Sequence, residues 1–160
     1  MPRIHHLIVS LLLLAACATT PLSTPKPSVV IASPTSQASR WIDVVLGDQV
    51  AYLWQDGQLV ASLPISSGVG DTPSTTTYTG EFTIATMYRG PEETVPGVFV
   101  QDVVIFDWEH GNGFHSLPMD ANGAILDPTV GKPASAGCIR VADSELLYEF
   151  AELGMRVVIR

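Results

Sequence analysis

The 160-residue chain contains few cations, few charged residues and few cysteines. Only 8 Lys and Arg stand against 16 Asp and Glu, which gives a net charge of −8, so no basic face for binding nucleic acid can form. Two cysteines exclude a disulfide framework and a four-cysteine zinc site. The 46% apolar content argues against disorder and is enough for the core of one domain. Cys17 and Cys138 therefore each need a separate explanation.

The N-terminus is typical of a bacterial secretory signal. Arg3 precedes an apolar run from Leu7 to Ala16 of about ten residues, which is too short to span a bilayer. The run ends in Leu-Ala-Ala-Cys, which resembles the lipobox of bacterial lipoproteins. This resemblance implies that residues 1–16 are removed, and that a lipid on Cys17 then attaches the protein to a membrane outside the cytoplasm. An ordinary secretory signal with an incidental cysteine is the alternative.

Residues 17–39 have the composition of a tether. Between residues 18 and 39, four prolines and nine Ser or Thr keep the chain solvated and leave no sustained apolar periodicity. The one apolar patch, Val29–Ile31, leaves open the alternative of an N-terminal strand. The predicted organisation is a signal peptide over 1–16, a lipid-anchored tether over 17–39 and one domain over 40–160.

The domain is predicted to be mainly β, a β-dominated α+β fold with one late helix. Asp56-Gly57 between two strand-like runs predicts a tight hairpin turn. The helix is predicted over 143–153, with Asp143 or Ser144 as its N-cap. Gly154 is expected at the C′ position that ends it. The predicted strands cover residues 41–46, 49–54, 58–65, 81–88, 98–106 and 155–159.

The neighbours of Cys138 favour a reactive cysteine over a structural one. Gly137 lets the backbone turn sharply or approach a ligand closely. Ser135 supplies a hydrogen-bond donor, and Arg140 places a permanent cation two residues away, which favours the thiolate. The alternative is that Cys138 is a small buried apolar residue.

A cysteine nucleophile needs a base within hydrogen-bond reach. Two of the four histidines are lost with the predicted signal peptide, which leaves His110 and His115. His110 precedes a Gly-Asn-Gly stretch and is predicted to be a surface residue in a turn. His115 follows Phe114 at the predicted start of a strand, and the hydroxyl or carbonyl of Ser116 can orient its imidazole. We therefore expect His115 to be the base.

The segment from His115 to Arg140 resembles the catalytic signature of the L,D-transpeptidase family, also called the YkuD domain. That signature is a histidine, a spacer, and then Ser-His-Gly-Cys followed by an apolar residue and Arg or Asn. Here nineteen residues separate His115 from Ser-Ala-Gly-Cys-Ile-Arg at 135–140. Two departures are Ala136 in place of the usual histidine, which removes a polar group from beside the expected nucleophile, and Tyr78 in place of a common proline. Further likeness lies in Asp48-Gln49, in residues 64–68 and 79–82, and in the last helix and strand.

The resemblance implies a compact β-sandwich or barrel-like domain that acts on peptidoglycan stem peptides. Cys138 would form a thioester after His115 takes its proton, with backbone N–H groups around Gly137 and Cys138 stabilising the oxyanion. An amine of a second stem peptide would then complete a 3→3 cross-link. Ser135 and Ser116 are expected to position the site, and Arg140 is expected to hold a substrate carboxylate or to form a structural ion pair.

Neither a cofactor nor a metal is expected, because the acidic residues show no ligand spacing and only two histidines remain after maturation. Two alternatives stay open at this point. Water in place of the amine would make the protein an L,D-carboxypeptidase. Loss of activity with retention of the fold would make it a wall-binding lipoprotein without catalysis, which Ala136 alone favours.

Overall fold

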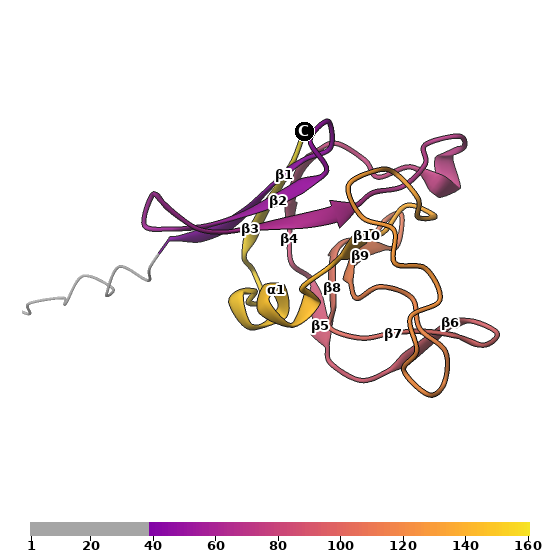
Figure 1. Ribbon diagram of the computed structural model, residues 1–160. Coiled ribbons are helices and arrows are strands. Elements are labelled where there is room, and N and C mark those ends of the chain that lie inside the picture. Colours follow the sequence, from indigo (N-terminus) through magenta and orange to yellow (C-terminus); the bar gives the residue numbers. More distant parts are fainter. Residues whose placement is uncertain (1–38) are drawn as a thin grey trace, which may run out of the picture. The chain divides into compact units, whose positions relative to one another are not determined.

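Residues 39–160, which the computed structural model describes, form eleven strands, one 3-10 turn and one α-helix (Figure 1). The predicted signal peptide, Cys17 and nearly all of the predicted tether lie outside the described residues. No helix in the described part is long and apolar enough to cross a membrane. The elements are β1 (Arg40–Val45), β2 (Val50–Gln55), β3 (Gln58–Ser66), η1 (Pro73–Thr75), β4 (Gly80–Thr83), β5 (Thr86–Tyr88), β6 (Glu92–Val95), β7 (Val98–Val100), β8 (Val103–Asp107), β9 (Asn112–His115), β10 (Ile139–Val141), α1 (Ser144–Phe150) and β11 (Arg156–Ile159).

The first three strands form two consecutive antiparallel hairpins, as the sequence predicts. Asp56 and Gly57 have φ angles of 51° and 76°, the left-handed conformation that a tight two-residue turn requires. In β2, the buried Ala51 and Leu53 alternate with less buried neighbours, because successive side chains of a strand point to opposite faces. The alternating apolar pattern of residues 49–54 therefore predicts both the strand and the face that it buries.

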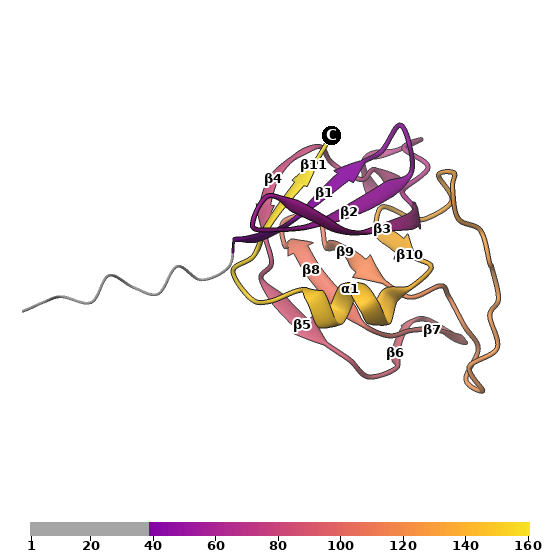
Figure 2. The same ribbon diagram turned by 60° about the vertical axis from the view of Figure 1, so that its left-hand side comes forward.

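Nine strands form one mixed sheet in the order β4-β11-β1-β2-β3-β10-β9-β8-β5, and β6 and β7 form a separate hairpin. Two neighbouring pairs are parallel, β1 with β11 and β9 with β10. The sheet is curled (Figure 2), so that Phe82 on the edge strand β4 contacts Phe106 on β8, with ring centroids 5.4 Å apart. Phe106 also packs against the fully buried Phe114 of β9. The predicted mainly β, barrel-like fold with one late helix is confirmed.

The prediction of one strand over 81–88 is wrong, because the chain crosses between distant parts of the sheet inside this stretch. β4 pairs with β11, whereas β5 pairs with β8. At the crossing, Ile84 N–H donates to the Met155 carbonyl at 2.9 Å and Ala85 N–H donates to the Ile105 carbonyl at 2.8 Å. These bonds satisfy the backbone where the strand is interrupted.

The predicted strand over 98–106 is also divided, into β7 and β8. The break occurs at Asp102, which has a φ of 54° and a buried carboxylate. That carboxylate accepts a 2.8 Å hydrogen bond from Ser144 Oγ at the start of α1, and Arg89 lies 3.5 Å away. A polar contact between residues far apart in the sequence therefore stabilises the interruption between β7 and β8. No local sequence pattern reveals such a contact.

Helix α1 is shorter than predicted. Its N-cap is Asp143, whose carboxylate accepts a 3.1 Å hydrogen bond from Leu146 N–H. The chain becomes extended at Ala151, so Gly154, with a φ of 82°, belongs to the next turn and does not occupy the C′ position. Leu147 is fully buried in the core, and the helix packs beside β10, next to the segment that carries Cys138.

Candidate active site

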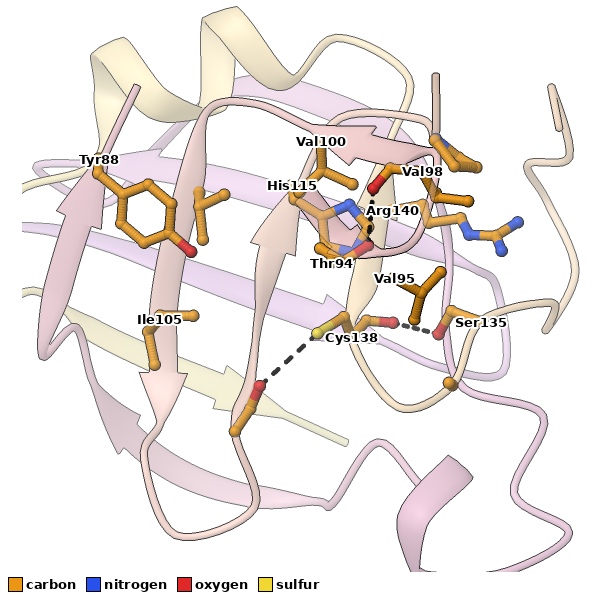
Figure 3. A pocket seen from close by; sticks show the side chains of 14 residues that line it. Tyr88, Thr94, Val95, Val98, Val100, Ile105, His115, Ser135, Cys138 and Arg140 are labelled. Atoms are coloured by element: carbon orange, nitrogen blue, oxygen red, sulfur yellow. Dashed lines mark hydrogen bonds between the residues drawn. The ribbon is translucent and has the colours of Figure 1, made fainter. Parts of the chain in front are cut away.

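Parallel pairing of β9 and β10 brings His115 and Cys138 together from distant parts of the sequence. The pairing sets Phe114 opposite Ile139 and His115 opposite Arg140. His115 is the last residue of β9, not the first residue of a strand as predicted, and Cys138 occupies the bend just before β10. Both side chains line one cavity of about 370 Å³ (Figure 3). The predicted nucleophile and the predicted base therefore share a single cavity.

The thiol of Cys138 is half-buried and uses a backbone acceptor. Its Sγ–H donates to the Gly111 carbonyl at 3.7 Å, and within the described chain no hydrogen bond joins Sγ to His115. Burial raises the pKa of the Cys138 thiol above its ordinary value, and only the nearby Gly113 N–H opposes this effect. The resting group is therefore a protonated thiol, which needs a base before it can attack a carbonyl.

Arg140 does not lower the pKa of Cys138, contrary to the sequence-based expectation. Its guanidinium forms an ion pair with Asp127. Hydrogen bonds from Thr129, and then the bond from Arg140, lower the pKa of the Asp127 carboxyl to about 2, so this partner stays ionised. The side chain of Arg140 also lines the cavity. Of the two roles expected for Arg140, the structural ion pair is therefore present.

The imidazole of His115 is held in one tautomer. Its Nδ1 lies 2.6 Å from the Ser116 carbonyl, which can only accept a hydrogen bond, so Nδ1 carries the proton and Nε2 is left with a lone pair. Burial lowers the pKa of His115, the Ser116 carbonyl opposes this effect, and the charge of Arg140 lowers the pKa further. His115 is therefore neutral near pH 7, the state that a general base requires.

Ser116 orients His115 through its carbonyl, and its hydroxyl has a different role. The hydroxyl donates to the Leu117 carbonyl at 2.9 Å and accepts a 3.0 Å hydrogen bond from Gln101 N–H. Ser116 N–H also donates to the Gln101 carbonyl at 3.0 Å. These bonds fix the backbone after β9 against the turn between β7 and β8, and so they fix the carbonyl that His115 contacts.

Ser135 holds the bend that carries the thiol. Its hydroxyl donates to the Cys138 carbonyl and accepts a 3.2 Å hydrogen bond from Gly137 N–H. The Gly137 carbonyl accepts a 2.6 Å hydrogen bond from Thr77 Oγ1. Cys138 N–H makes no hydrogen bond with any residue in 39–160. Of the two predicted oxyanion donors, the Cys138 N–H is therefore available, whereas the Gly137 N–H is already bonded within the loop.

Comparisons with known proteins identify the family of the domain. The model of the YkuD family, the L,D-transpeptidase catalytic domain, matches residues 39–159. The chain belongs to this family. YciB of Bacillus subtilis (strain 168), whose name carries a provisional L,D-transpeptidase assignment, is 30% identical over 149 residues, which cover 89% of this chain and 76% of YciB.

Solved structures of L,D-transpeptidases share the fold at low sequence identity. The enzyme from Mycobacterium smegmatis has a TM-score of 0.59 and 18% identity, over 77% of this chain and 59% of that one. The Xylanimonas cellulosilytica structure has a TM-score of 0.60 and 21% identity, over 79% and 63% of the two chains. The catalytic domain from E. faecium has a TM-score of 0.54 and 22% identity, over 79% of this chain and 100% of that domain. This chain thus spans less than two thirds of the first two proteins.

Residues behind the Cys138 bend of the YkuD domain support it, and the sequence alone predicts no role for them. The buried Gln49 side chain bonds to Ser67, with Oε1 accepting from Ser67 N–H at 2.9 Å and Nε2 donating to Ser67 Oγ at 2.8 Å. The next residue, Gly68, forms a bridge with Ser135. A Cβ at Gly68 would lie 2.9 Å from the Gly137 Cα. The Asp48-Gln49 and Ser-Ser-Gly elements that belong to the family pattern therefore lie together behind Cys138.

Gly137→Ala is expected to move Cys138 and to destabilise the domain. The φ of Gly137 is 111°, and a Cβ there would lie 2.6 Å from Asn112 Oδ1 and 3.2 Å from the Thr76 carbonyl. We expect a loss of about 1–3 kcal/mol in the free energy of unfolding and at least tenfold slower acylation by a carbapenem. Denaturant unfolding and stopped-flow acylation measure the two effects. Gly47→Ala is the control, because that glycine has no atom within 4 Å of its Cβ position.

Proposed function

We propose that the protein is a cysteine-dependent L,D-transpeptidase, an acyltransferase that joins peptidoglycan stem peptides through 3→3 cross-links. The observation that carries this proposal is the single cavity that contains the Cys138 thiol and the neutral His115 imidazole. Cys138 N–H provides a free donor beside them. Family membership supports the reaction class, and the geometry supports the role proposed for each of these groups.

In the acylation step, the thiol leaves the Gly111 carbonyl by rotation about χ1 and transfers its proton to His115 Nε2. Sγ attacks the carbonyl carbon of the third stem residue, and the Cys138 N–H stabilises the oxyanion. The tetrahedral intermediate collapses with cleavage of the C–N bond. His115 returns its proton to the leaving amine of D-Ala, which leaves a thioester on Cys138.

In the second step, an amine of another stem peptide attacks the thioester carbonyl. His115 accepts a proton from that amine, the C–S bond breaks, and the proton passes to the Cys138 sulfur to restore the thiol. Apolar side chains make up much of the cavity wall, which disfavours water near the thioester and supports aminolysis over hydrolysis. They are Val95, Val98, Val100, Val103 and Ile105.

Two alternatives remain distinct from this proposal. An L,D-carboxypeptidase would use the same acylation step and then admit water. A wall-binding lipoprotein without activity would have no use for the fixed His115 tautomer, which argues against that alternative. Ala136 is exposed at the cavity and provides no polar group, so the proposed chemistry relies on His115 alone as its base.

Lipid attachment at Cys17 and a location in the cell envelope complete the proposal. Peptidoglycan lies outside the cytoplasmic membrane, so an anchored enzyme would stay beside its substrate. Mass spectrometry of the mature N-terminus tests this part alone, and a free thiol on Cys17 would contradict it. Ser135, Ser116, Gly137 and Arg140 are proposed to position the site through the contacts described above.

Incubation of the protein with purified tetrapeptide muropeptides, followed by mass spectrometry, tests the reaction. We expect dimers joined between third residues, together with released D-Ala. Tripeptides without dimers would instead indicate the carboxypeptidase, and unchanged substrate would indicate the inactive binding protein. Among the structural neighbours, one is a complex with the carbapenem imipenem, which recommends carbapenems as probes of Cys138, and another, from Mycobacterium tuberculosis, carries an adduct derived from the penem faropenem.

A further inference from the structure

A second cavity adjoins the one that contains Cys138. It has a volume of about 360 Å³, close to that of the first cavity. Tyr88, Ile105 and Gly111 line both cavities, and the Gly111 carbonyl is the group that accepts the Cys138 thiol. A ligand that extends away from the nucleophile can therefore enter the second cavity without leaving the surface. The second cavity is lined by Thr86, Tyr88, Ile105, Trp108 and Gly111.

Trp108 is the most exposed large apolar side chain in residues 39–160, with 74% of its surface accessible. It lies in the turn between β8 and β9, and contacts of the neighbouring His110 keep this turn in place. His110 Nδ1 lies 2.8 Å from Oδ2 of the buried Asp107, and the His110 ring stacks on Tyr78 at a centroid distance of 3.8 Å. Because the turn is already ordered, binding a ligand against Trp108 costs little conformational entropy.

The lining of the second cavity is uncharged and combines aromatic rings with hydroxyl groups. Burial raises the pKa of Tyr88, and the charge of Glu92 raises it further, so its hydroxyl stays protonated and can donate a hydrogen bond. Thr86 supplies a second hydroxyl. A stem peptide carries charged groups, and nothing in this lining pairs with charge. A pyranose ring suits the lining better, since its C–H face packs on an indole and its hydroxyl groups bond to Tyr88 and Thr86.

We propose that this second cavity, with Trp108 as its stacking surface, binds a sugar ring of the glycan strand to which the donor stem peptide is attached. The inference rests on the proposed transpeptidase function, because the sugar is then covalently linked to the peptide that Cys138 attacks. Three extended residues span about 10 Å between the attacked carbonyl and the glycan end of the stem, a length suited to neighbouring cavities. The enzyme would thus recognise the glycan-attached stem in preference to the free peptide.

The test compares the full-length protein and its Trp108→Ala variant on two donors, a disaccharide-tetrapeptide and the free tetrapeptide. We expect the wild type to have the lower KM for the disaccharide-tetrapeptide. We expect Trp108→Ala to raise that KM about tenfold, with kcat and the kinetics of the free tetrapeptide unchanged. Trp108→Phe retains a ring and should recover part of the loss. Leu153→Ala, which removes another side chain that is 67% exposed, is the matched control and should change neither donor.

A binding measurement separates this inference from the reaction. The Cys138→Ala protein is titrated with the GlcNAc–MurNAc disaccharide that carries no peptide. Its tryptophan fluorescence should change and reach saturation, and this change should disappear when Trp108→Ala is added. An equal rise in KM for both donors in Trp108→Ala would overturn the inference and indicate a peptide site. An unchanged KM for the disaccharide-tetrapeptide in Trp108→Ala would also overturn the inference. If neither donor is converted by the wild type, the proposed function fails, whereas the disaccharide titration still reports on the sugar site.

Discussion

Cys138→Ala is expected to abolish covalent modification by a carbapenem and the formation of any cross-linked product. The variant removes the only thiol in residues 39–160, and the other cavity side chains that could attack a carbonyl are the hydroxyls of Tyr88, Thr94 and Ser135, which are weaker nucleophiles than a thiolate. Intact-protein mass spectrometry should show complete conversion of the wild type to the adduct and none of the variant. The expected loss is at least about 10⁴-fold, since covalent catalysis disappears with the sulfur.

Cys17→Ser is the matched control for that experiment, because it removes the other cysteine of the chain. Its adduct should form at the wild-type rate, and peptide mapping should place the added mass on the fragment that contains Cys138. A thermal melt of Cys138→Ala shows whether the fold is retained. An adduct on a folded Cys138→Ala protein would contradict the proposed nucleophile.

His115→Gln is expected to slow acylation by about 10²–10⁴-fold near pH 7. The reason is that burial raises the pKa of Cys138, so little thiolate exists without a base. In the wild type, kcat/KM should fall at low pH as His115 becomes protonated. Because burial also lowers the pKa of His115, this fall should begin below the ordinary histidine value of about 6.5. Carbapenem acylation measured from pH 5 to 10 provides the profile.

The variant should show a different pH profile from that of the wild type. Without the base, acylation depends on spontaneous ionisation of Cys138, so its rate should rise about tenfold per pH unit up to the raised pKa of the thiol. The difference between wild type and variant should therefore be largest near neutrality and shrink in alkaline solution. A constant deficit across the pH range would indicate that His115 has a structural role only.

Local patterns in the sequence were sufficient for the parts of the fold that depend on neighbouring residues. The hairpins of β1 to β3 follow from alternation and from Asp56-Gly57, and α1 follows from the Asp143 cap. The short strands β6, β9 and β10 were not predicted, because strands of three or four residues carry too little periodicity. The break at Asp102 also escaped prediction, since its cause is a contact with Ser144.

In the candidate site, the sequence predicted which residues take part but not how they are arranged. The neighbours of Cys138, the elimination of the other histidines and the motif resemblance together selected Cys138 and His115, and the structure places both in one cavity. The charge environment was not predictable, because the partner of Arg140 is Asp127, thirteen positions away in an irregular loop. Nor does the sequence reveal that Gly137 N–H bonds to Ser135 and so leaves only Cys138 N–H available. Both points depend on loop geometry that residue types alone do not determine.

The parallel pair of β1 and β11 constrains the order in which the domain can fold. β11 lies between β1 and β4 in the sheet, so until the last strand has been synthesised β4 has no strand partner and β1 is paired on one side only, with β2. Such distant pairing slows folding, because a long loop must close before the contact stabilises it. The sheet therefore stays incomplete while the chain emerges, which suits the proposed export of the protein across a membrane before it folds.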